Sequence, residues 1–181
     1  MIQLFTELQE KKNVRSNLSA LRASLKEATE EQKAQAIEFV RGHEDLVFGF
    51  LQEEDAKTRK NAALLLGDLA VQNALQPLWK AYTREQTLFV KSAYLEAMKA
   101  LHAEEILSQL KDRLAELEGE PVTEENRKHR EAELRALRAI LIQYEGIDTH
   151  HFDIKQKNNH VLLVTNRNHR GILENQTGGK A

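Results

Sequence analysis

Two short runs of the chain combine cationic side chains with amide and imidazole groups. The first is Asn126-Arg127-Lys128-His129-Arg130, and the second is Asn166-Arg167-Asn168-His169-Arg170. Cations neutralise phosphate oxygens, and amide and imidazole donors suit phosphates and sugar hydroxyls. The chemistry that these runs favour is the binding of a polyanion such as RNA. The alternative is that each run is a charged surface that keeps its segment soluble, because no aromatic residue alternates with these cations to stack on bases.

A smaller set of cations recurs with the helical pattern of the chain. Arg59-Lys60 and Lys91 lie at equivalent points of two successive repeats, so they are predicted to form a ladder on one face. A solvated helix surface is again the alternative. The residues predicted to bind RNA or a partner are Arg59, Lys60, Lys91, Asn126, Arg127, Lys128, Arg130, Asn166, Arg167 and Arg170.

Residues that serve as nucleophiles, acids and bases occur without the spacing that catalysis needs. Cysteine is absent, which excludes thiolate nucleophiles, thiolate zinc sites and disulfides. There is no Gly-x-Ser-x-Gly motif and no glycine-rich phosphate loop. Carboxylate pairs such as Glu53-Glu54 are explained by helix capping and solvation. We therefore predict no catalytic residue, no cofactor and no enzymatic activity for this chain.

The seven histidines raise the question of a metal site, above all in the stretch from Asp148 to Asp153. His150 and His151 are adjacent, and adjacent residues of a strand point to opposite faces. Only one of them can then share a site with Asp153, which is fewer ligands than a structural zinc site needs. We expect no metal site.

The elements that must position these residues follow from a repeat. Residues 58–78 and 90–110 have the same pattern, offset by 32 positions without a gap, so that Arg59 aligns with Lys91 and Leu69 with Leu101. Each unit has two apolar stripes and no strand pattern, which indicates a helix pair that cannot bury its own face. Stacked units bury these faces against one another. The predicted fold is all-α: an α-solenoid of helical hairpins, a class that usually binds partners along an extended surface.

Single residues predict details of the packing. Asp55 is predicted to cap the first helix of the first repeat, and Gly67 is expected to relieve crowding where the second helix crosses. Pro77 falls in the first turn of the partner helix, where a missing N–H does least harm. Thr123 is predicted to cap a long last helix that stops before Gly146.

The pattern changes after Gly146. Residues 151–155 and 160–165 are predicted to form the two strands of a short β-hairpin. A lone hairpin is marginal in water, so it either packs on the helices or begins a domain that this chain does not contain. The predicted domains are a solenoid at residues 1–145, a small hairpin segment at 146–176 and a disordered tail at 177–181.

Charge and hydropathy limit the classes of protein to which this chain can belong. The formal charge is −2, but residues 1–125 hold 16 Lys/Arg against 22 Asp/Glu, whereas residues 126–181 hold 10 against 6. A basic last third can place a polyanion at one end, and an unevenly charged solvated surface is the alternative. No apolar stretch approaches the roughly 20 residues of a membrane helix. We expect a cytoplasmic protein.

Four stretches resemble known families. Residues 59–69 resemble the HEAT-repeat signature, in which an arginine, an alanine pair and Leu-Gly recur. Residues 87–95, 125–129 and 162–170 resemble the N-terminal region of bacterial RNA methyltransferases that carry HEAT repeats ahead of their catalytic module. The resemblance covers about residues 1–176 and implies a right-handed HEAT/armadillo-like solenoid followed by a small α/β segment.

The same resemblance implies an S-adenosylmethionine-binding domain that this chain does not contain. Its only prolines are Pro77 and Pro121, so the Asn/Asp-Pro-Pro-aromatic motif of amino-methyltransferases cannot be present. No methyl-transfer residue can be carried over, and the chain is expected to be an N-terminal fragment or a reduced relative. S-adenosylmethionine would be bound only by a catalytic domain that follows.

Two hypotheses of different classes result. The first is a non-catalytic recognition domain that binds the RNA substrate of a methyltransferase. The second is a protein–protein scaffold, without a nucleic-acid role, whose groove receives a helix or a peptide. Neither involves a membrane.

Overall fold

The computed structural model describes residues 1–144, 156–157 and 160–161. The chain divides into two units, Met1–Tyr144 and Glu145–Ala181. The regular structure of the first unit is entirely helical, so the all-α prediction is confirmed. Its elements, with three short 3-10 helices labelled η, are α1 Ile2–Gln9, α2 Val14–Leu25, α3 Glu30–Gly42, α4 Glu44–Gly49, η1 Phe50–Gln52, α5 Ala56–Asp68, η2 Gln72–Ala74, α6 Leu75–Arg84, α7 Leu88–Ala100, η3 Glu104–Ile106, α8 Leu107–Gly119 and α9 Arg127–Leu141.

The described residues of the second unit form two very short strands. β1 (Gln156–Lys157) pairs antiparallel with β2 (His160–Val161). The predicted strand at residues 151–155 and most of the second one lie outside the described residues. The hairpin segment and the tail therefore stay predictions.

The 32-residue repeat of the sequence is also a repeat of local structure. Helix α7 begins and ends 32 positions after α5, and α8 begins 32 positions after α6. Ala70 and His102, also 32 positions apart, both have a positive φ, 51° and 53°. The two units thus share not only their apolar stripes but also the left-handed residue that ends the first helix of each.

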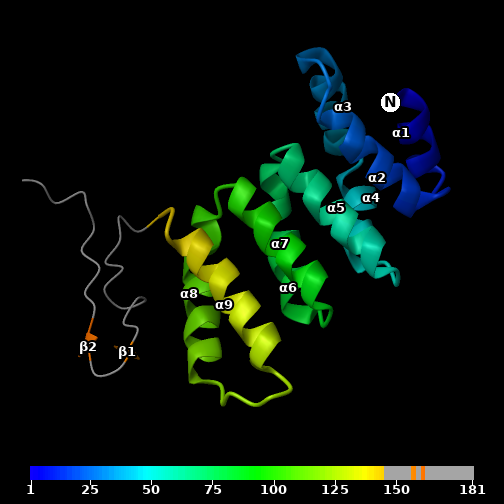
Figure 1. Cartoon of the computed structure of the whole chain (residues 1–181). Helices are drawn as coiled ribbons and strands as arrows, with labels where there is room; N and C mark the ends of the chain where they lie inside the picture. The colour runs from blue at the N-terminus through cyan, green and yellow to red at the C-terminus, as the bar shows by residue number, and fades with distance from the viewer. Residues whose placement is uncertain (145–155, 158–159, 162–181) are drawn as a thin grey trace, which may run out of the picture. The chain divides into compact units, whose positions relative to one another are not determined.

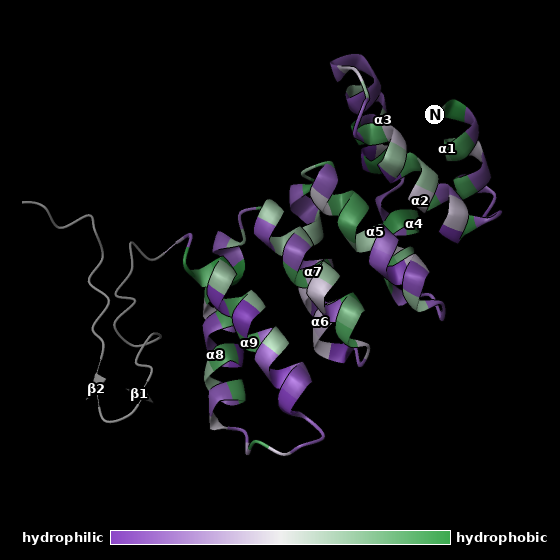
Figure 2. Ribbon diagram, in the orientation of Figure 1, coloured by the Kyte–Doolittle hydropathy of each residue, from purple (hydrophilic) through white to green (hydrophobic). Residues whose placement is uncertain are grey.

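The helices of the first unit lie in two layers (Figure 1). Helices α2, α5, α7 and α9 follow one another side by side in chain order and run in the same direction, and α5 packs on both α2 and α7. Helices α6 and α8 lie behind them. Helix α6 packs on α7, and α8 packs on α9. Figure 2 shows that hydrophilic residues dominate the N-terminal half of α9. None of the described helices is long and apolar enough to cross a membrane.

The core confirms the predicted apolar stripes. The side chains of Leu65, Leu66 and Met98 are fully buried between neighbouring helices. Removing apolar surface from water in this way is the main favourable term in folding. Because α5 and α7 each have a neighbour on both sides, both are buried over more of their surface than an isolated hairpin allows.

Gly67 lies at a close helix crossing, as predicted, but the helix that crosses there is α7, the first helix of the next unit, and not α6, the second helix of its own unit. A Cβ atom built on Gly67 would come within 2.9 Å of the Cα atom of Ala97. Glycine is therefore required for this close approach rather than for a special φ angle. Asp55 also acts as predicted, because its carboxylate accepts a hydrogen bond of 2.7 Å from the backbone N–H of Thr58.

The predicted start of the last helix was wrong. Helix α9 begins at Arg127 and its N-cap is Asn126, rather than Thr123. The side chains of Thr123 and Asn126 each accept a hydrogen bond from the backbone N–H of the other, at 3.2 and 2.8 Å. This reciprocal pair closes a turn at residues 124–126 that runs directly into the helix, because the Arg127 N–H donates to the Thr123 carbonyl at 3.0 Å. Glu124 and Glu125 lie in that turn and not in the first turn of α9.

Candidate functional site

The first residue of the predicted ladder is held inside the protein. The Arg59 guanidinium forms an ion pair with Glu85, with Nε–Oε2 at 2.8 Å, and donates to the carbonyls of Glu53 and Glu54, also at 2.8 Å. Burial disfavours the charged form of Glu85, but the bonds from Arg59 and from the Thr87 backbone outweigh it and keep its pKa below 4.5. Arg59 thus ties α5 to the segment between α6 and α7.

The equivalent residue of the second repeat pairs elsewhere. Lys91 lies 3.3 Å from the carboxylate of Glu133 on α9, which also accepts from Tyr82 at 2.5 Å and from Arg113 at 3.1 Å. These four residues form the Glu133 cluster. Burial alone would raise the pKa of Glu133, but the hydrogen bond from Tyr82 and the charges of Lys91 and Arg113 hold it below 4.5. The cluster joins α6, α7, α8 and α9.

Two predicted residues of α9 also bond within the protein. Arg130 is half-buried rather than exposed, and it donates to the backbone carbonyls of Leu117 and Glu118 at 2.7 and 3.1 Å. It satisfies carbonyls at the end of α8, where a cation is favourable. The Asn126 amide donates to the carbonyl of Pro121 at 2.9 Å in addition to its bond with Thr123.

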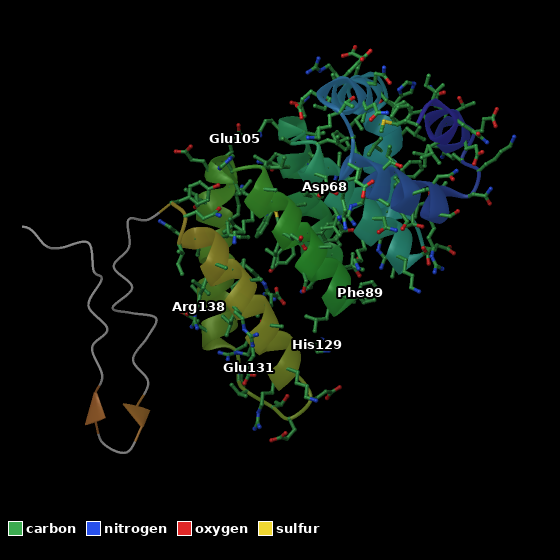
Figure 3. All side chains as sticks on the ribbon, turned by 45° about the horizontal axis from the view of Figure 1, so that its top comes forward. Asp68, Phe89, Glu105, His129, Glu131 and Arg138 are labelled. Carbon is green, nitrogen blue, oxygen red and sulfur yellow. The ribbon has the colours of Figure 1, made fainter. Side chains whose placement is uncertain are left out.

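The other predicted residues of α9 are exposed. Arg127 forms an ion pair of 2.6 Å with Glu124 on the surface, and Lys128 is exposed and forms no ion pair with any residue of 1–144. His129 lies beside them in the first turn of α9 (Figure 3). The remaining predicted residues, Asn166, Arg167 and Arg170, lie outside the described residues.

A groove with a basic lining crosses three of the side-by-side helices. It has a volume of about 540 Å³ and takes residues from α2, α5 and α7. We call it the basic groove; its lining is Arg15, Ser16, Ser19, Lys57, Lys60, Asn61 and Phe89.

The cations of the basic groove form no ion pair within residues 1–144, although the charge of Arg15 acts on Asp55, the N-cap of α5, and helps to lower the pKa of its carboxylate. The lining of the groove has three cations and no carboxylate. Within residues 1–144, Arg15, Lys57 and Lys60 make no ion pair, in contrast to Arg59 and Lys91. The hydroxyls and the amide add neutral hydrogen-bonding groups. Such a surface attracts an anion, because each cation can exchange a counterion for a bound phosphate.

Phe89 gives the basic groove an apolar surface. Its side chain is 46% exposed, and it projects from the first turn of α7 (Figure 3). It is the only aromatic residue among the large exposed apolar residues of the described chain. An exposed ring beside cations is suited to stacking on a planar group such as a nucleobase.

A second, larger groove has a different character. It has a volume of about 830 Å³ and lies between η1 and α6, with Phe48, Leu51, Pro77 and Trp79 among its apolar lining. We call it the apolar groove. Its exposed charges are mixed, so it does not select for an anion.

No group of histidines, cysteines and carboxylates among the residues of 1–144 has the arrangement of a metal site. Comparison of the chain with protein-family models, with curated proteins and with solved structures yields no match.

Sequence reasoning identified Lys60 but missed Arg15, Lys57 and Phe89. A signal was present, because Lys57 and Phe89 are equivalent positions of the two repeats. The groove itself could not be inferred from the repeat, because α2 lies outside the clear repeat and supplies Arg15 and both serines of the lining.

Proposed function

We propose that this chain is a right-handed HEAT/armadillo-like α-solenoid that recognises RNA and has no catalytic centre of its own. The observation that carries the proposal is the basic groove. Arg15, Lys57 and Lys60 converge there from two helices, and no carboxylate lines the groove.

The packing supports the solenoid part of the proposal. The succession of α2, α5, α7 and α9, each beside the next, is the arrangement of stacked repeats rather than of a closed bundle. The exact 32-residue spacing of α5 and α7 supports the resemblance of residues 59–69 to a HEAT repeat.

Three observations favour RNA over other anions. The groove continues across several helices, which suits an extended polyanion, and it offers Ser and Asn side chains for phosphate or sugar oxygens. Exposed cations occur on α9 as well: Lys128, and Arg127, which pairs with Glu124 on the surface. The resemblance to the N-terminal region of RNA methyltransferases supports the same partner, and S-adenosylmethionine would belong to a domain outside this chain.

Fluorescence anisotropy with labelled ribosomal RNA fragments tests the proposal. If Arg15, Lys57, Lys60, Arg127 and Lys128 each neutralise one phosphate, the logarithm of the association constant falls with the logarithm of salt at a slope of about −3.5. The affinity then drops roughly 100-fold between 50 and 200 mM salt. Equally negligible binding at low and moderate salt would rule out RNA recognition.

A matched pair of variants locates the site. Lys57→Glu/Lys60→Glu should weaken binding at least about tenfold and make the salt slope shallower by about 1.4. Lys26→Glu/Lys99→Glu makes the same change of charge at the C-terminal ends of α2 and α7, both exposed, and should leave binding nearly unchanged. Equal losses in the two variants would assign the effect to net charge and not to the basic groove.

A protein–protein scaffold is the second candidate, and the apolar groove is the observation that favours it. Its volume and its Trp79 suit an apolar segment of a partner protein. A pull-down with the whole chain distinguishes the two functions. A scaffold should recover a stoichiometric protein that survives nuclease treatment and is lost in Trp79→Ala but not in Lys57→Glu/Lys60→Glu.

A further inference from the structure

Four residues hold the same place in the side-by-side helices of residues 1–144. Arg15, Lys57, Phe89 and Lys128 are each the second residue of their helix, in α2, α5, α7 and α9 respectively. These helices run in the same direction, so their first turns lie along one edge (Figure 1). We call these four residues the edge row.

The edge row is long enough for several nucleotides. Neighbouring packed helices have axes about 8–10 Å apart, so three steps from α2 to α9 span roughly 24–30 Å. Arg15, Lys57 and Phe89 also line the basic groove, which makes the first three members parts of one continuous surface. The order along the row is cation, cation, aromatic, cation.

Helix stability does not explain these residue types. The N-terminal turn of a helix is the positive end of its dipole, so acidic residues are favourable there and cations are not. Arg15, Lys57 and Lys128 all stand at that unfavourable end without an ion pair within residues 1–144, although the charge of Asp55, the N-cap of α5, acts on Arg15. Phe89 is 46% exposed and gains little from burial. The shared feature of the four is accessibility to a ligand.

We propose that the edge row binds single-stranded RNA, with phosphates on Arg15, Lys57 and Lys128 and an unpaired base stacked on Phe89. This inference rests on the proposed function and specifies its ligand. Stacking needs a free base face, which an A-form duplex does not offer because its bases cover one another. A duplex can use the cations of the row but not the ring.

The test compares two RNA probes with the full chain at one salt concentration. The first is a fluorescein-labelled oligouridine of about 12 nucleotides, within the site sizes of single-strand binding proteins, and the second is a labelled duplex of the same length. The wild-type chain should prefer the single strand. Phe89→Ala should weaken single-strand binding by about 5- to 150-fold, leave duplex binding unchanged and keep the salt slope.

Two further variants separate stacking from a general loss of structure. Phe89→Trp should retain single-strand binding, because it keeps a flat aromatic face. In a Trp79→Phe background that indole is the single tryptophan of the chain, and oligouridine should quench its fluorescence on stacking. Lys128→Ala should weaken both probes and make the single-strand salt slope shallower by about 0.7.

The outcomes separate this inference from the function on which it rests. If Phe89→Ala binds the single strand as the wild type does, or loses duplex and single-strand binding equally, the edge row does not stack a base and the inference is overturned. The proposed function survives that result. If the wild-type chain binds neither probe, RNA recognition and the edge row are both refuted.

Discussion

The crossing of α5 and α7 allows a sharp test of how the repeats pack. Gly67 is the closest point of that crossing, and a Cβ atom there would lie 2.9 Å from the Cα atom and 3.2 Å from the Cβ atom of Ala97. Ordinary carbon contacts lie at about 3.5–4.0 Å. Because the nearest obstacle is backbone, Gly67→Ala cannot be accommodated by turning a side chain. Helix α7 has to move away from α5.

Two effects of opposite sign determine how much Gly67→Ala changes the free energy of unfolding. Alanine stabilises a helix relative to glycine by about 0.5–1 kcal/mol. Overpacking of a filled interface costs about 1–3 kcal/mol. Gly49→Ala isolates the first term, because Gly49 has helical φ and ψ of −57° and −36° and no atom within 4 Å of an added Cβ. Gly67→Ala should therefore be less stable than Gly49→Ala by about 1–3 kcal/mol.

Urea denaturation followed by circular dichroism measures this difference as a change in the free energy of unfolding. Gly49→Ala should be as stable as the wild type or slightly more so, and Gly67→Ala should be less stable than both. The reasoning fails if the two variants are equally stable, because that result means that α5 and α7 do not cross closely at Gly67 in solution.

Three further predictions concern the core, a helix end and the buried carboxylates. Leu66→Ala should lower the free energy of unfolding by about 2–5 kcal/mol, because Leu66 is fully buried; a thermal melt within error of the wild type would contradict its placement between the repeats. Ala70→Gly should raise the free energy of unfolding by about 1 kcal/mol in the same melts, because Ala70 has a φ of 51°, which favours glycine. The control Ala115→Gly, in the middle of α8, should lower the free energy of unfolding by about as much. Changes of the same sign in the two variants would argue against the left-handed turn at Ala70. Glu133 has a pKa below 4.5 in the folded chain, so its ionised form contributes stability above about pH 4.5 that is lost as the pH falls further. Glu133→Gln should then be less stable than the wild type at pH 7 by about 1–3 kcal/mol. In urea denaturation this difference in the free energy of unfolding should become smaller below pH 4.5. A difference that does not depend on pH would contradict the lowered pKa.

The helices and the repeat were predictable because the signals are local. The apolar stripes, Asp55 as a cap and Pro77 in a first turn all depend on residues within one or two helical turns. Gly67 was predictable for a related reason, since a glycine inside an otherwise good helix signals a close approach. The start of α9 was not predicted, because Thr123 caps the turn at residues 124–126 and the helix begins only after that turn.

The partners of the cations were not predictable from the repeat. Arg59 and Lys91 are equivalent in sequence, but Arg59 pairs with Glu85 and Lys91 pairs with Glu133. The position that corresponds to Glu85 in the second repeat is Leu117, so periodicity predicts no acidic partner there at all. The actual partner comes from α9, 42 residues away along the chain.

The amino-acid sequence by itself thus determined the all-α class, the helix pairs and their period, because an apolar stripe of period 3.6 specifies a helix wherever the chain places it. Only the tertiary structure decided which cations are available to a ligand. Arg59, Lys91 and Arg130 bond to groups from other segments of the chain, whereas Arg15, Lys57 and Lys60 form no ion pair within residues 1–144 and line the basic groove with Phe89. Charge pairing acts through space over a few ångströms, and those distances exist only after the helices have packed.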